Sequence, residues 1–485
     1  MKFIFFVSLT RMMPRLLLLV TACLAGIGSA PAVPVNFVFF LIDDLGWGDL
    51  ACYGNPHVRT PHIDQLAREG VRFTDAYAAA PVCSPARAGL FTGRWPARVG
   101  VTDAVGEAGI KWNGGRKTIP PANASQLALA EITLAESLRT SGYATASIGK
   151  WHLGGEGFLA QDQGFDVNFS GNRLGSHKSM FGPDYGIGLS AVSSKEYLTD
   201  RLQREAEAFI TRHRERPFFV VVSHYAVHRP VDAKPETVAR QPAKGPPPWG
   251  LVPEYAAMIE DTDASIGRMR DFLRDQGLEQ NTVIVFTSDN GAVRFWGSNG
   301  GLRDTKGTLY DAGIRVPLII RLPDGTGAGR VSTVPVHGCD LFPTLLDLAG
   351  VTPPAVLQLD GASLVPVLRG AGGFPAERPL FWHYPHYNMH GATPASALRV
   401  GDLKLLEFFE DGRRELYDLR VDPAEKKDLA VSRPEVVARL AARLAEFRQN
   451  TRALLPKPNP AYAGVEPELP ELRPFESTRT LPGGK

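Results

Sequence analysis

The sequence predicts an α/β fold: a large, mostly parallel, helix-covered sheet followed by a smaller C-terminal antiparallel α+β subdomain. Two observations predict it. From Val35 to about Arg369, short apolar runs of strand character alternate with helical stretches, as in sheets whose parallel strands are joined by helices. After Arg369, apolar runs follow one another across turn residues, which is typical of antiparallel hairpins.

The composition is that of an ordinary globular protein. The chain has 485 residues, 44% hydrophobic and 21% charged, which excludes the disordered, fibrous and coiled-coil classes. Its 53 Lys and Arg against 51 Asp and Glu leave a formal net charge of +2. Because so small a net charge creates no general field for anions, we expect no nucleic-acid partner and no binding to an anionic membrane surface.

Residues 1–34 predict a signal peptide and linker. Arg11 and Arg15 precede an apolar run, and small residues follow it up to Ala32, which is the pattern of a secretory signal cleaved after Ala32. A start at Met12 or Met13 would also give a well-proportioned signal. We therefore expect an exported protein, periplasmic or secreted.

Two alternatives to a cleaved signal peptide remain open. The stretch Val20-Thr21-Ala22-Cys23 resembles a bacterial lipobox, which would leave Cys23 as a lipidated first residue. A retained anchor is less favoured because the apolar run is shorter than the ~20 residues that a span requires. No later segment has the pattern of a membrane span, so we expect no integral span.

Four predicted strands of the large domain end in residues that can carry chemistry. They are Val35–Ile42 before Asp43-Asp44, Ala144–Ile148 before Gly149-Lys150-Trp151-His152, Pro217–Val222 before the segment Ser223 to His228, and Thr282–Thr287 before Ser288-Asp289-Asn290. Ligands of open α/β sheets bind beyond the carboxyl ends of the strands. We therefore expect these side chains to converge on one place.

The convergence favours a divalent cation. A lone Asp pair after a strand is usually a turn former or a helix cap. Asp43, Asp44, Asp289 and Asn290 together supply hard oxygen ligands, and adjacent carboxylates repel unless a positive charge compensates them. This ligand set suits Ca²⁺ or Mg²⁺ rather than zinc.

The segment Cys83-Ser84-Pro85-Ala86-Arg87 is the most specific motif. Pro85 predicts the first turn of a helix, which places Cys83 at the N-terminal edge, where free backbone amides favour an anion. Arg87, one turn further on, could add a charged donor. From these residues alone, a buried structural cysteine is an equally good interpretation.

Three cysteines remain once a signal peptide is removed: Cys52, Cys83 and Cys339. The odd number leaves at least one free thiol in an exported protein, where disulfides are permitted. A Cys52–Cys339 disulfide and two unpaired cysteines packed as small apolar groups both remain open.

The Cys83 motif matches the C-x-P-x-R element of the type I sulfatases, and Leu90–Arg94 matches its usual extension. Further elements resemble that family in the same order: Asp43–Asp49, Gly149–Gly154, the segment bearing His228, Ser288–Gly291, and Lys306–Tyr310 with Gly313–Pro317. The resemblance spans about Val35 to Leu429 and looks closest to bacterial polysaccharide sulfatases and arylsulfatases. It implies an alkaline phosphatase-like fold for the large domain.

The resemblance implies that Cys83 is oxidised to formylglycine by a formylglycine-generating or anaerobic sulfatase-maturing enzyme. In the hydrated aldehyde, one hydroxyl would attack sulfur, and deprotonation of the other would later expel sulfate. By similarity, one Ca²⁺, with Mg²⁺ as the alternative, would contact the modified Cys83 and a sulfate oxygen. The implied metal ligands are Asp43, Asp44, Cys83, Asp289 and Asn290.

The resemblance also implies roles for the cationic side chains. Arg87 and Lys150 would stabilise the hydrate and the sulfate, and His152 would take the proton from the second hydroxyl. His228 and Lys306 would bind sulfate and protonate the leaving oxygen. His224 competes with His228 for this role, but His228 precedes the Arg229-Pro230 turn, as the family's histidine typically precedes a proline.

Two departures from the family pattern stand near these residues. Leu302–Thr305 replaces a segment in which relatives often carry glycines, and the region of His228 lacks the second nearby histidine of many relatives. Neither removes a residue with an implied role.

The predicted function is a sulfuric ester hydrolase that removes sulfate from a sulfated carbohydrate, such as a galactose or N-acetylgalactosamine unit. One alternative is a phosphomonoester or phosphonate hydrolase of the alkaline phosphatase superfamily, which the single predicted cation site and the Cys83 motif disfavour. The other is a non-catalytic glycan-binding relative, which would not need the nucleophile.

The predicted domains are residues 35–369 and 370–455. Residues 456–485 form a Pro-rich tail, whose composition predicts an extended segment or disorder. The subdomain elements are strands at Pro379–His383, Ala397–Phe409 and Glu415–Leu419, a hairpin turn at Asp411-Gly412, and a helix at Pro434–Gln449.

Two histidine-bearing stretches are candidates for a substrate rim. His383, His386 and His390 lack acidic or cysteine partners nearby in the sequence, which favours a rim over a zinc site. Ser176-His177-Lys178 lies in the glycine-rich stretch Gly171–Gly188, where a sugar or an anion could bind.

Overall fold

The computed structural model describes residues 1–2, 34–106, 115–241, 250–294 and 296–465. The chain divides into two compact units, Met1–Pro34 and Val35–Lys485, and all the elements of the fold belong to the second. Most of the predicted leader, Cys23 included, and residues 466–485 of the tail lie outside the described residues, so what was inferred for them stays a prediction. Within the described ranges, no helix combines the length and the apolar character that a membrane span needs.

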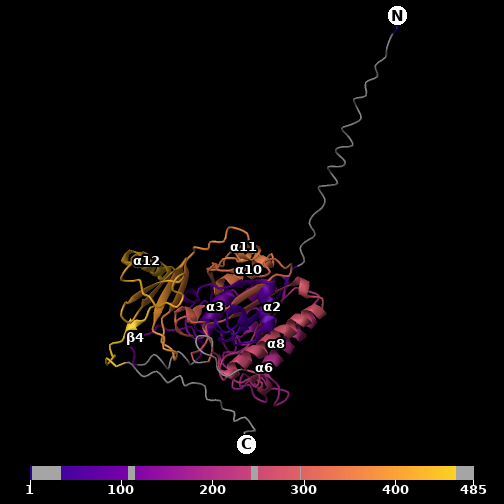
Figure 1. Cartoon of the computed structure of the whole chain (residues 1–485), viewed down its shortest axis with the longest axis horizontal. Helices are drawn as coiled ribbons and strands as arrows, with labels where there is room; N and C mark the ends of the chain where they lie inside the picture. The colour runs from indigo at the N-terminus through magenta and orange to yellow at the C-terminus, as the bar shows by residue number, and fades with distance from the viewer. Residues whose placement is uncertain (3–33, 107–114, 242–249, 295, 466–485) are drawn as a thin grey trace. The chain divides into compact units, whose positions relative to one another are not determined.

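An eight-stranded sheet forms the centre of the fold (Figure 1). Neighbouring strands run parallel except β9, which is antiparallel to both β2 and β8. The strands, in spatial order, are β10 (Arg330–Ser332), β2 (Val71–Phe73), β9 (Leu318–Arg321), β8 (Thr282–Ser288), β1 (Asn36–Ile42), β7 (Phe218–Ser223), β5 (Ala144–Gly149) and β6 (Val167–Phe169). The predicted mostly parallel sheet is confirmed.

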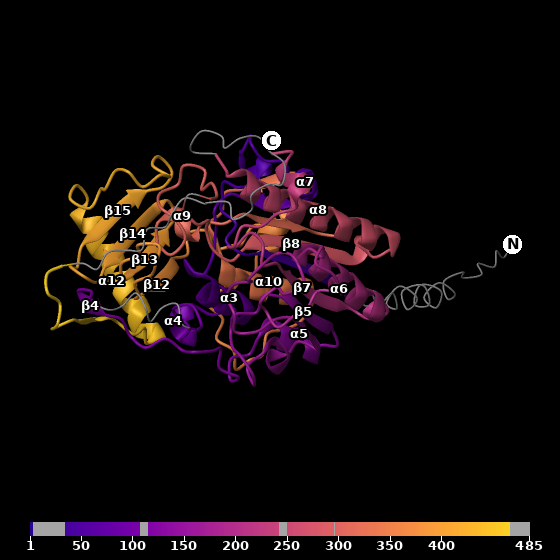
Figure 2. The same cartoon turned by 90° about the horizontal axis from the view of Figure 1, so that it is seen from below.

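The helices cover both faces of this sheet (Figure 2). One core joins Val38, Phe40 and Ile42 of β1 to α2 (Pro61–Glu69), α6 (Leu198–His213) and α8 (Pro253–Asp275). The other joins Phe37, Phe39 and Leu41 to α3 (Cys83–Thr92), α5 (Leu134–Thr140) and α10 (Leu341–Leu348). Because both faces of β1 are buried, its sequence is a continuous apolar run after Asn36.

The C-terminal part builds a separate antiparallel sheet, which confirms the predicted second component of the fold. It consists of β12 (Leu380–Tyr384), β13 (Ala395–Val400), β14 (Leu403–Phe408) and β15 (Arg414–Asp418), in that order. One face packs on α12 (Pro434–Thr451) through Phe381, Leu405 and Leu444, among others (Figure 2). The other face packs on Tyr77 and Ile314. The predicted domain boundaries themselves stay predictions.

The remaining elements are short. They are α4 (Pro96–Val99), α7 (Pro235–Val238), α9 (Asp311–Ile314), α11 (Val365–Arg369), the 3₁₀ turns η1 (Ala51–Tyr53), η3 (Ala160–Gln163), η4 (Glu279–Asn281) and η5 (Gly338–Asp340), and the strand pairs β3 (Ala76–Tyr77) with β11 (Val336–His337) and β4 (Thr118–Ile119) with β16 (Lys457–Pro458). Through β16, the start of the tail is tied to a segment more than 300 residues earlier. Cys52, Cys83 and Cys339 are free thiols, so the Cys52–Cys339 disulfide does not form.

A buried charge cluster, here called the closed cluster, joins the C-terminal sheet to the large domain. Lys404 of β14 pairs with Asp311 at 2.8 Å and with Glu425 at 2.9 Å, and all three side chains are fully buried. Arg315 and Arg399 extend the cluster by pairing with the two carboxylate oxygens of Asp75 at 3.0 and 2.8 Å, respectively. The cluster consists of Asp75, Asp311, Arg315, Arg399, Lys404 and Glu425.

Candidate active site at the ends of four central strands

The four predicted chemistry-bearing strands are neighbours, in the order β8-β1-β7-β5. Their carboxyl ends deliver Asp289, Asp43, the segment Ser223 to His228, and Lys150 to one edge of the sheet. Backbone hydrogen bonds continue the ladder past the strands: Asp289 N donates to Ile42 O at 3.1 Å, and Asp43 N donates to Ala226 O at 3.0 Å. The loops that carry the site are therefore held by the sheet itself.

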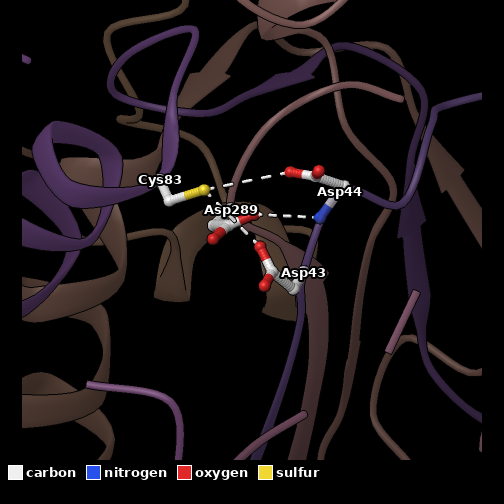
Figure 3. A group of neighbouring side chains, drawn as sticks. All are labelled: Asp43, Asp44, Cys83 and Asp289. Atoms are coloured by element: carbon white, nitrogen blue, oxygen red, sulfur yellow. Dashed lines mark hydrogen bonds between the residues drawn. The ribbon is translucent and has the colours of Figure 1, made fainter. Parts of the chain in front are cut away.

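Cys83 begins α3 and lies at the centre of the group. The residue is 4% exposed, and its thiol contacts Asp43 Oδ1 at 3.5 Å and Asp44 Oδ1 at 3.9 Å. Figure 3 shows the sulfur facing these two carboxylates, with Asp289 beside them. Burial raises the pKa of the thiol to about 12, so the unmodified cysteine is a neutral thiol and a poor nucleophile.

Three cationic side chains pair with three carboxylates around Cys83. Lys150 Nζ donates to Asp43 at 2.7 Å, Arg87 Nε to Asp289 at 2.8 Å, and Lys306 Nζ to Asp44 at 2.5 Å. Lys306 Nζ also lies 3.3 Å from Cys83 Sγ. We call these six charged residues the open cluster: Asp43, Asp44, Arg87, Lys150, Asp289 and Lys306.

The pKa shifts follow from burial and from these pairs. Burial raises the pKa of Asp43 to about 7 despite the charge of Lys150. Burial alone would also raise the pKa of Asp44, but the charge of Lys306 and the smaller contributions of its other cationic neighbours together outweigh burial and hold this pKa below its usual range. For Lys306, burial lowers the pKa, but the charge of Asp44 and the smaller contributions of the other acidic groups around it together outweigh burial and raise the pKa, so Lys306 remains a cation.

Two unpaired ligand atoms make this group fit a metal ion. Ligand atoms of Asp43, Asp44, Cys83 and Asp289 lie within 4.8 Å of one another. Asp44 Oδ2 and Asn290 Oδ1 are buried without a hydrogen-bond partner. An unsatisfied buried acceptor costs free energy, and a hard cation would satisfy both oxygens. Because the charges of the open cluster cancel, a bound divalent cation would leave the site positive, which suits an anionic substrate.

His152 is held as a neutral base. Its Nε2 lies 3.0 Å from Val105 O, and because a carbonyl only accepts, Nε2 carries the hydrogen and Nδ1 is left as an acceptor. Nδ1 is buried without a partner. Burial, followed by the charges of Lys150 and Arg87, lowers the pKa of His152 well below its ordinary value.

His224 and His228 have different environments. His224 is fully buried, stacks on Phe40 with an interplanar angle of 2° and makes no hydrogen bond with either ring nitrogen. His228 lines the site cavity, donates from Nδ1 to Arg229 O at 2.7 Å, and places Nε2 3.6 Å from Asp44 Oδ2. The structure therefore brings His228, and not His224, to the open cluster.

Two site residues have a left-handed backbone conformation. Asp44 has a φ of 65° and His152 a φ of 58°, which non-glycine residues rarely adopt. Their surroundings hold them there: Asp44 N donates to Asp289 Oδ1 at 3.2 Å, and His152 N donates to Asn172 O at 2.9 Å. A Cβ added to Gly175 would lie 2.4 Å from the His152 ring, so this position requires glycine. Such local strain is typical of functional sites.

The open cluster lies against a cavity of about 440 Å³. Cys83, Asp44, Lys306, His152 and His228 line it. Several further lining residues were not singled out from the sequence: Asp103, Arg173, Arg229, Tyr384 and Asn388. They come from loops and from the C-terminal sheet, and no strand-end pattern marks them; only the position of Asp103 soon after the Cys83 helix could have drawn attention to it.

The predicted rim is correct only in part. Ser176 and His390 line the cavity. His177 is buried with Nε2 3.1 Å from Pro230 O, Lys178 pairs with Asp184 at 3.0 Å on the surface, and His383 contacts Ser396 Oγ at 2.7 Å and Leu454 O at 3.0 Å. Placing these three on the rim was wrong, because each side chain is taken up by another contact. His386 lines an adjoining cavity instead.

Comparison with known proteins identifies the family. The family model described as Sulfatase matches residues 35–351, and one described as N-sulphoglucosamine sulphohydrolase, C-terminal, matches residues 301–450. Arylsulfatase A of Homo sapiens is 32% identical, covering 94% of this chain and 95% of its own length. N-acetylgalactosamine-6-sulfatase of Canis lupus familiaris is 35% identical, covering 76% of this chain and 72% of its own. The chain belongs to the sulfatase family and is a sulfuric ester hydrolase.

Solved structures agree with this assignment. Ps i-CgsB in complex with k-i-k-neocarrahexaose has a TM-score of 0.74 at 26% identity, covering 85% of this chain and 92% of that one. A second structure, in complex with its substrate D-glucosamine-2-N,6-O-disulfate, has a TM-score of 0.68 at 26% identity, covering 86% and 98%. A phosphonate monoester hydrolase of Agrobacterium radiobacter, 22% identical with a TM-score of 0.65, shares the fold, covering 88% and 99%.

Proposed function

We propose that this enzyme removes sulfate from a sulfated galactose or hexosamine unit of a glycan, with Cys83 converted to formylglycine and one Ca²⁺ bound by Asp43, Asp44, Asp289 and Asn290. One observation carries the proposal: the Cys83 side chain lies at a cavity, among three carboxylates, with Lys306 3.3 Å away. Relatives named for N-acetylgalactosamine 6-sulfate and a structure named for a glucosamine disulfate support a sulfated sugar as substrate.

The cavity's cationic groups would bind and orient the sulfate. Lys306 lines the cavity and stays charged because Asp44 raises its pKa. Lys150 and Arg87 lie behind Asp43 and Asp289 and balance their charges. A hydrated aldehyde at position 83 supplies a hydroxyl nucleophile, which the neutral thiol described above does not. The cation, when bound, offsets negative charge on the sulfuryl oxygens.

The two cavity histidines would move protons. His152 Nδ1 is a buried acceptor without a partner, suited to take a proton from a hydroxyl on residue 83. His228 lies on the cavity wall with Nε2 3.6 Å from Asp44. Burial lowers the pKa of His228 well below its ordinary value and the charge of Asp44 opposes this shift, so the ring would pass on a proton readily to the leaving oxygen. The maturing enzyme that modifies Cys83 and the export of the protein are parts of the same proposal.

The first test is chemical. The tryptic peptide 73–87, isolated from protein produced in its own host, is examined for its mass and for reaction with an aldehyde probe. We expect formylglycine at position 83, while the peptides that contain Cys52 and Cys339 keep their thiols and serve as internal controls. An unmodified thiol at position 83 would overturn the proposed nucleophile.

The second test is enzymatic. Sulfate release is measured on galactose and hexosamine sulfates, with phosphate and phosphonate monoesters of the same alcohols as matched substrates. We expect release from at least one sulfated sugar in the presence of Ca²⁺. Faster turnover of the phosphonate esters would contradict the proposed substrate class.

A further inference from the structure

A second cavity adjoins the active-site cavity. It measures about 800 Å³ and shares four consecutive wall residues, Asp103 to Gly106, and Arg173 with the first cavity. Its other walls include Asn123, Glu156 and His386. The lining therefore combines polar side chains with apolar ones, which suits a hydroxyl-rich ligand such as a sugar, whose rings also carry apolar faces.

Hydrogen bonds from several segments hold the shared wall in place. Thr102 N and Asp103 N both donate to Asn123 Oδ1, at 2.8 and 3.0 Å. Val105 N donates to Ser84 Oγ at 2.9 Å, and Val105 O faces His152 Nε2 at 3.0 Å. The wall shared by the two cavities is thus hydrogen-bonded directly to α3, which carries Cys83, and to the proposed base His152.

Asp103 presents a hydrogen-bond acceptor at the wall shared by the two cavities. Its Oδ1 accepts from Tyr384 OH and from Ala104 N, both at 2.8 Å. Within the described part of the chain, nothing donates to Oδ2, although the side chain lines both cavities and is only 4% exposed. A carboxylate with one oxygen held and the other open is suited to bind a sugar hydroxyl.

Arg173 presents a cation at the same shared wall. Its side chain lies over Gly155, where an added Cβ would be 3.6 Å from Arg173 Cδ. Among the described residues, no carboxylate pairs with its guanidinium, Glu156 of the same cavity included. A guanidinium without a partner on a cavity wall is a site for a sulfate or carboxylate group.

We propose that the second cavity binds the neighbouring unit of the same glycan, with an anionic substituent of that unit on Arg173 and a sugar hydroxyl on Asp103. The substrate is then a polyanionic oligosaccharide rather than a free sulfated monosaccharide. This inference rests on the proposed function, because it takes the first cavity as the place of the sulfated unit.

The test is a binding measurement that needs no turnover. Cys83→Ala protein loaded with Ca²⁺ is titrated calorimetrically with N-acetylgalactosamine 6-sulfate, with a chondroitin 6-sulfate tetrasaccharide, and with the same tetrasaccharide after carboxyl reduction. We expect the unmodified tetrasaccharide to bind about tenfold more tightly than the other two, one charged contact being worth about a factor of ten.

Variants test whether Arg173 and Asp103, on the wall shared by the two cavities, cause the tighter binding. Adding Arg173→Ala should remove the tenfold preference, and adding Asp103→Asn should weaken the binding of both tetrasaccharides. Lys178→Ala, which removes a nearby cation that lines neither cavity, should keep the preference. Equal affinity for all three ligands, or a preference that survives Arg173→Ala, overturns the inference.

Turnover separates this inference from the proposed function. An active wild-type enzyme that desulfates the monosaccharide and the tetrasaccharide with equal kcat/KM overturns the second cavity's role and leaves the proposed function intact. A wild-type enzyme without sulfatase activity on any sulfated sugar overturns the proposed function, and the binding preference still decides whether the second cavity holds an anionic unit.

Discussion

The molecule contains two buried charge clusters of equal size with different properties. The open cluster and the closed cluster each combine three carboxylates with three cations. In the closed cluster, five of the six carboxylate oxygens accept a hydrogen bond: both oxygens of Asp311, from Lys404 and Tyr77, Glu425 Oε2, from Asp311 N, and both oxygens of Asp75, from Arg399 and Arg315. The sixth, Glu425 Oε1, accepts no hydrogen bond from the described residues but is compensated by its ion pair with Lys404 at 2.9 Å. Lys404, at the centre of this cluster, is fully buried.

The open cluster is balanced in charge but not in hydrogen bonds. Asp44 Oδ2 and Arg87 Nη2 of the cluster, and Asn290 Oδ1 and His152 Nδ1 beside it, are buried without hydrogen-bond partners. Since buried polar groups are normally paired, this concentration of unpaired atoms beside a cavity indicates a site for ligands. The comparison teaches that burial and ion pairing alone do not mark an active site; unsatisfied atoms next to open space do.

The largest effect should come from the centre of the open cluster. Cys83→Ala removes the residue that would become the nucleophile, and we expect kcat on a sulfated sugar to fall by at least about 10³-fold. The thermal midpoint should stay within a few degrees of wild type, because the small residue leaves the ion pairs in place. Turnover retained by Cys83→Ala would show that the open cluster is not the reactive site, and the comparison between the two clusters would fail.

A charge removed from the closed cluster should reduce stability instead. Lys404→Met leaves Asp311 and Glu425 without their shared cation, and breaking a buried pair costs about 3–5 kcal/mol. Urea unfolding should show this loss, while the kcat of the folded fraction stays near that of wild type. Lys306→Met is the matched variant in the open cluster, where we expect lost activity and a smaller loss of stability.

Metal binding should stabilise the protein through the open cluster only. Calcium added to chelator-treated protein at a hundred times its Kd should stabilise the fold by about 2.7 kcal/mol, measured as a rise in the thermal midpoint. Asn290→Ala, which removes one unpaired oxygen, should weaken the response. An unchanged midpoint after calcium addition would contradict a cation site, and a larger response to magnesium would change the ion assigned to it.

The smallest effect concerns His224, which belongs to neither cluster. Burial lowers its pKa to about 3, so the unfolded state binds the proton first, and stability is lost as the pH falls below about 6.5. His224→Phe keeps the stacked ring on Phe40 and removes this titration. Between pH 7 and pH 5.5, the free energy of unfolding of the variant should rise by on the order of 1 kcal/mol relative to that of wild type. Parallel pH profiles of the unfolding free energy of the two proteins would refute this.

Much of the large domain could be predicted from the sequence because its signals are local. A strand buried on both faces has to be a continuous apolar run, so β1, β5, β7 and β8 could be recognised directly. The residues after these strands could then be assigned to one edge, since the carboxyl ends of parallel strands meet there. The predicted helix start at Cys83 suggested Arg87, and the family motifs added Lys306; no strand-end pattern would have selected either residue.

The adjoining residues could not be predicted in this way. Asp103 and Arg173 lie in loops, and Tyr384 and Asn388 come from the C-terminal part, almost 300 residues after Asp103. His383 and His177 have the composition of binding residues, yet their ring nitrogens are bonded to Leu454 O and Pro230 O. A histidine's partner is a tertiary fact, and neither residue type nor spacing records it.

By itself the sequence determined the fold class, the four strands that end at the site, the helix that begins at Cys83, and membership of a chemical family through motifs in order. These depend on periodicity, turn chemistry and local spacing. Only the tertiary structure decided which ligand atoms remain unpaired, which histidine nitrogen is free, and that a second cavity shares the wall at Asp103. These properties depend on contacts between segments far apart in the chain, whose distances are set by packing.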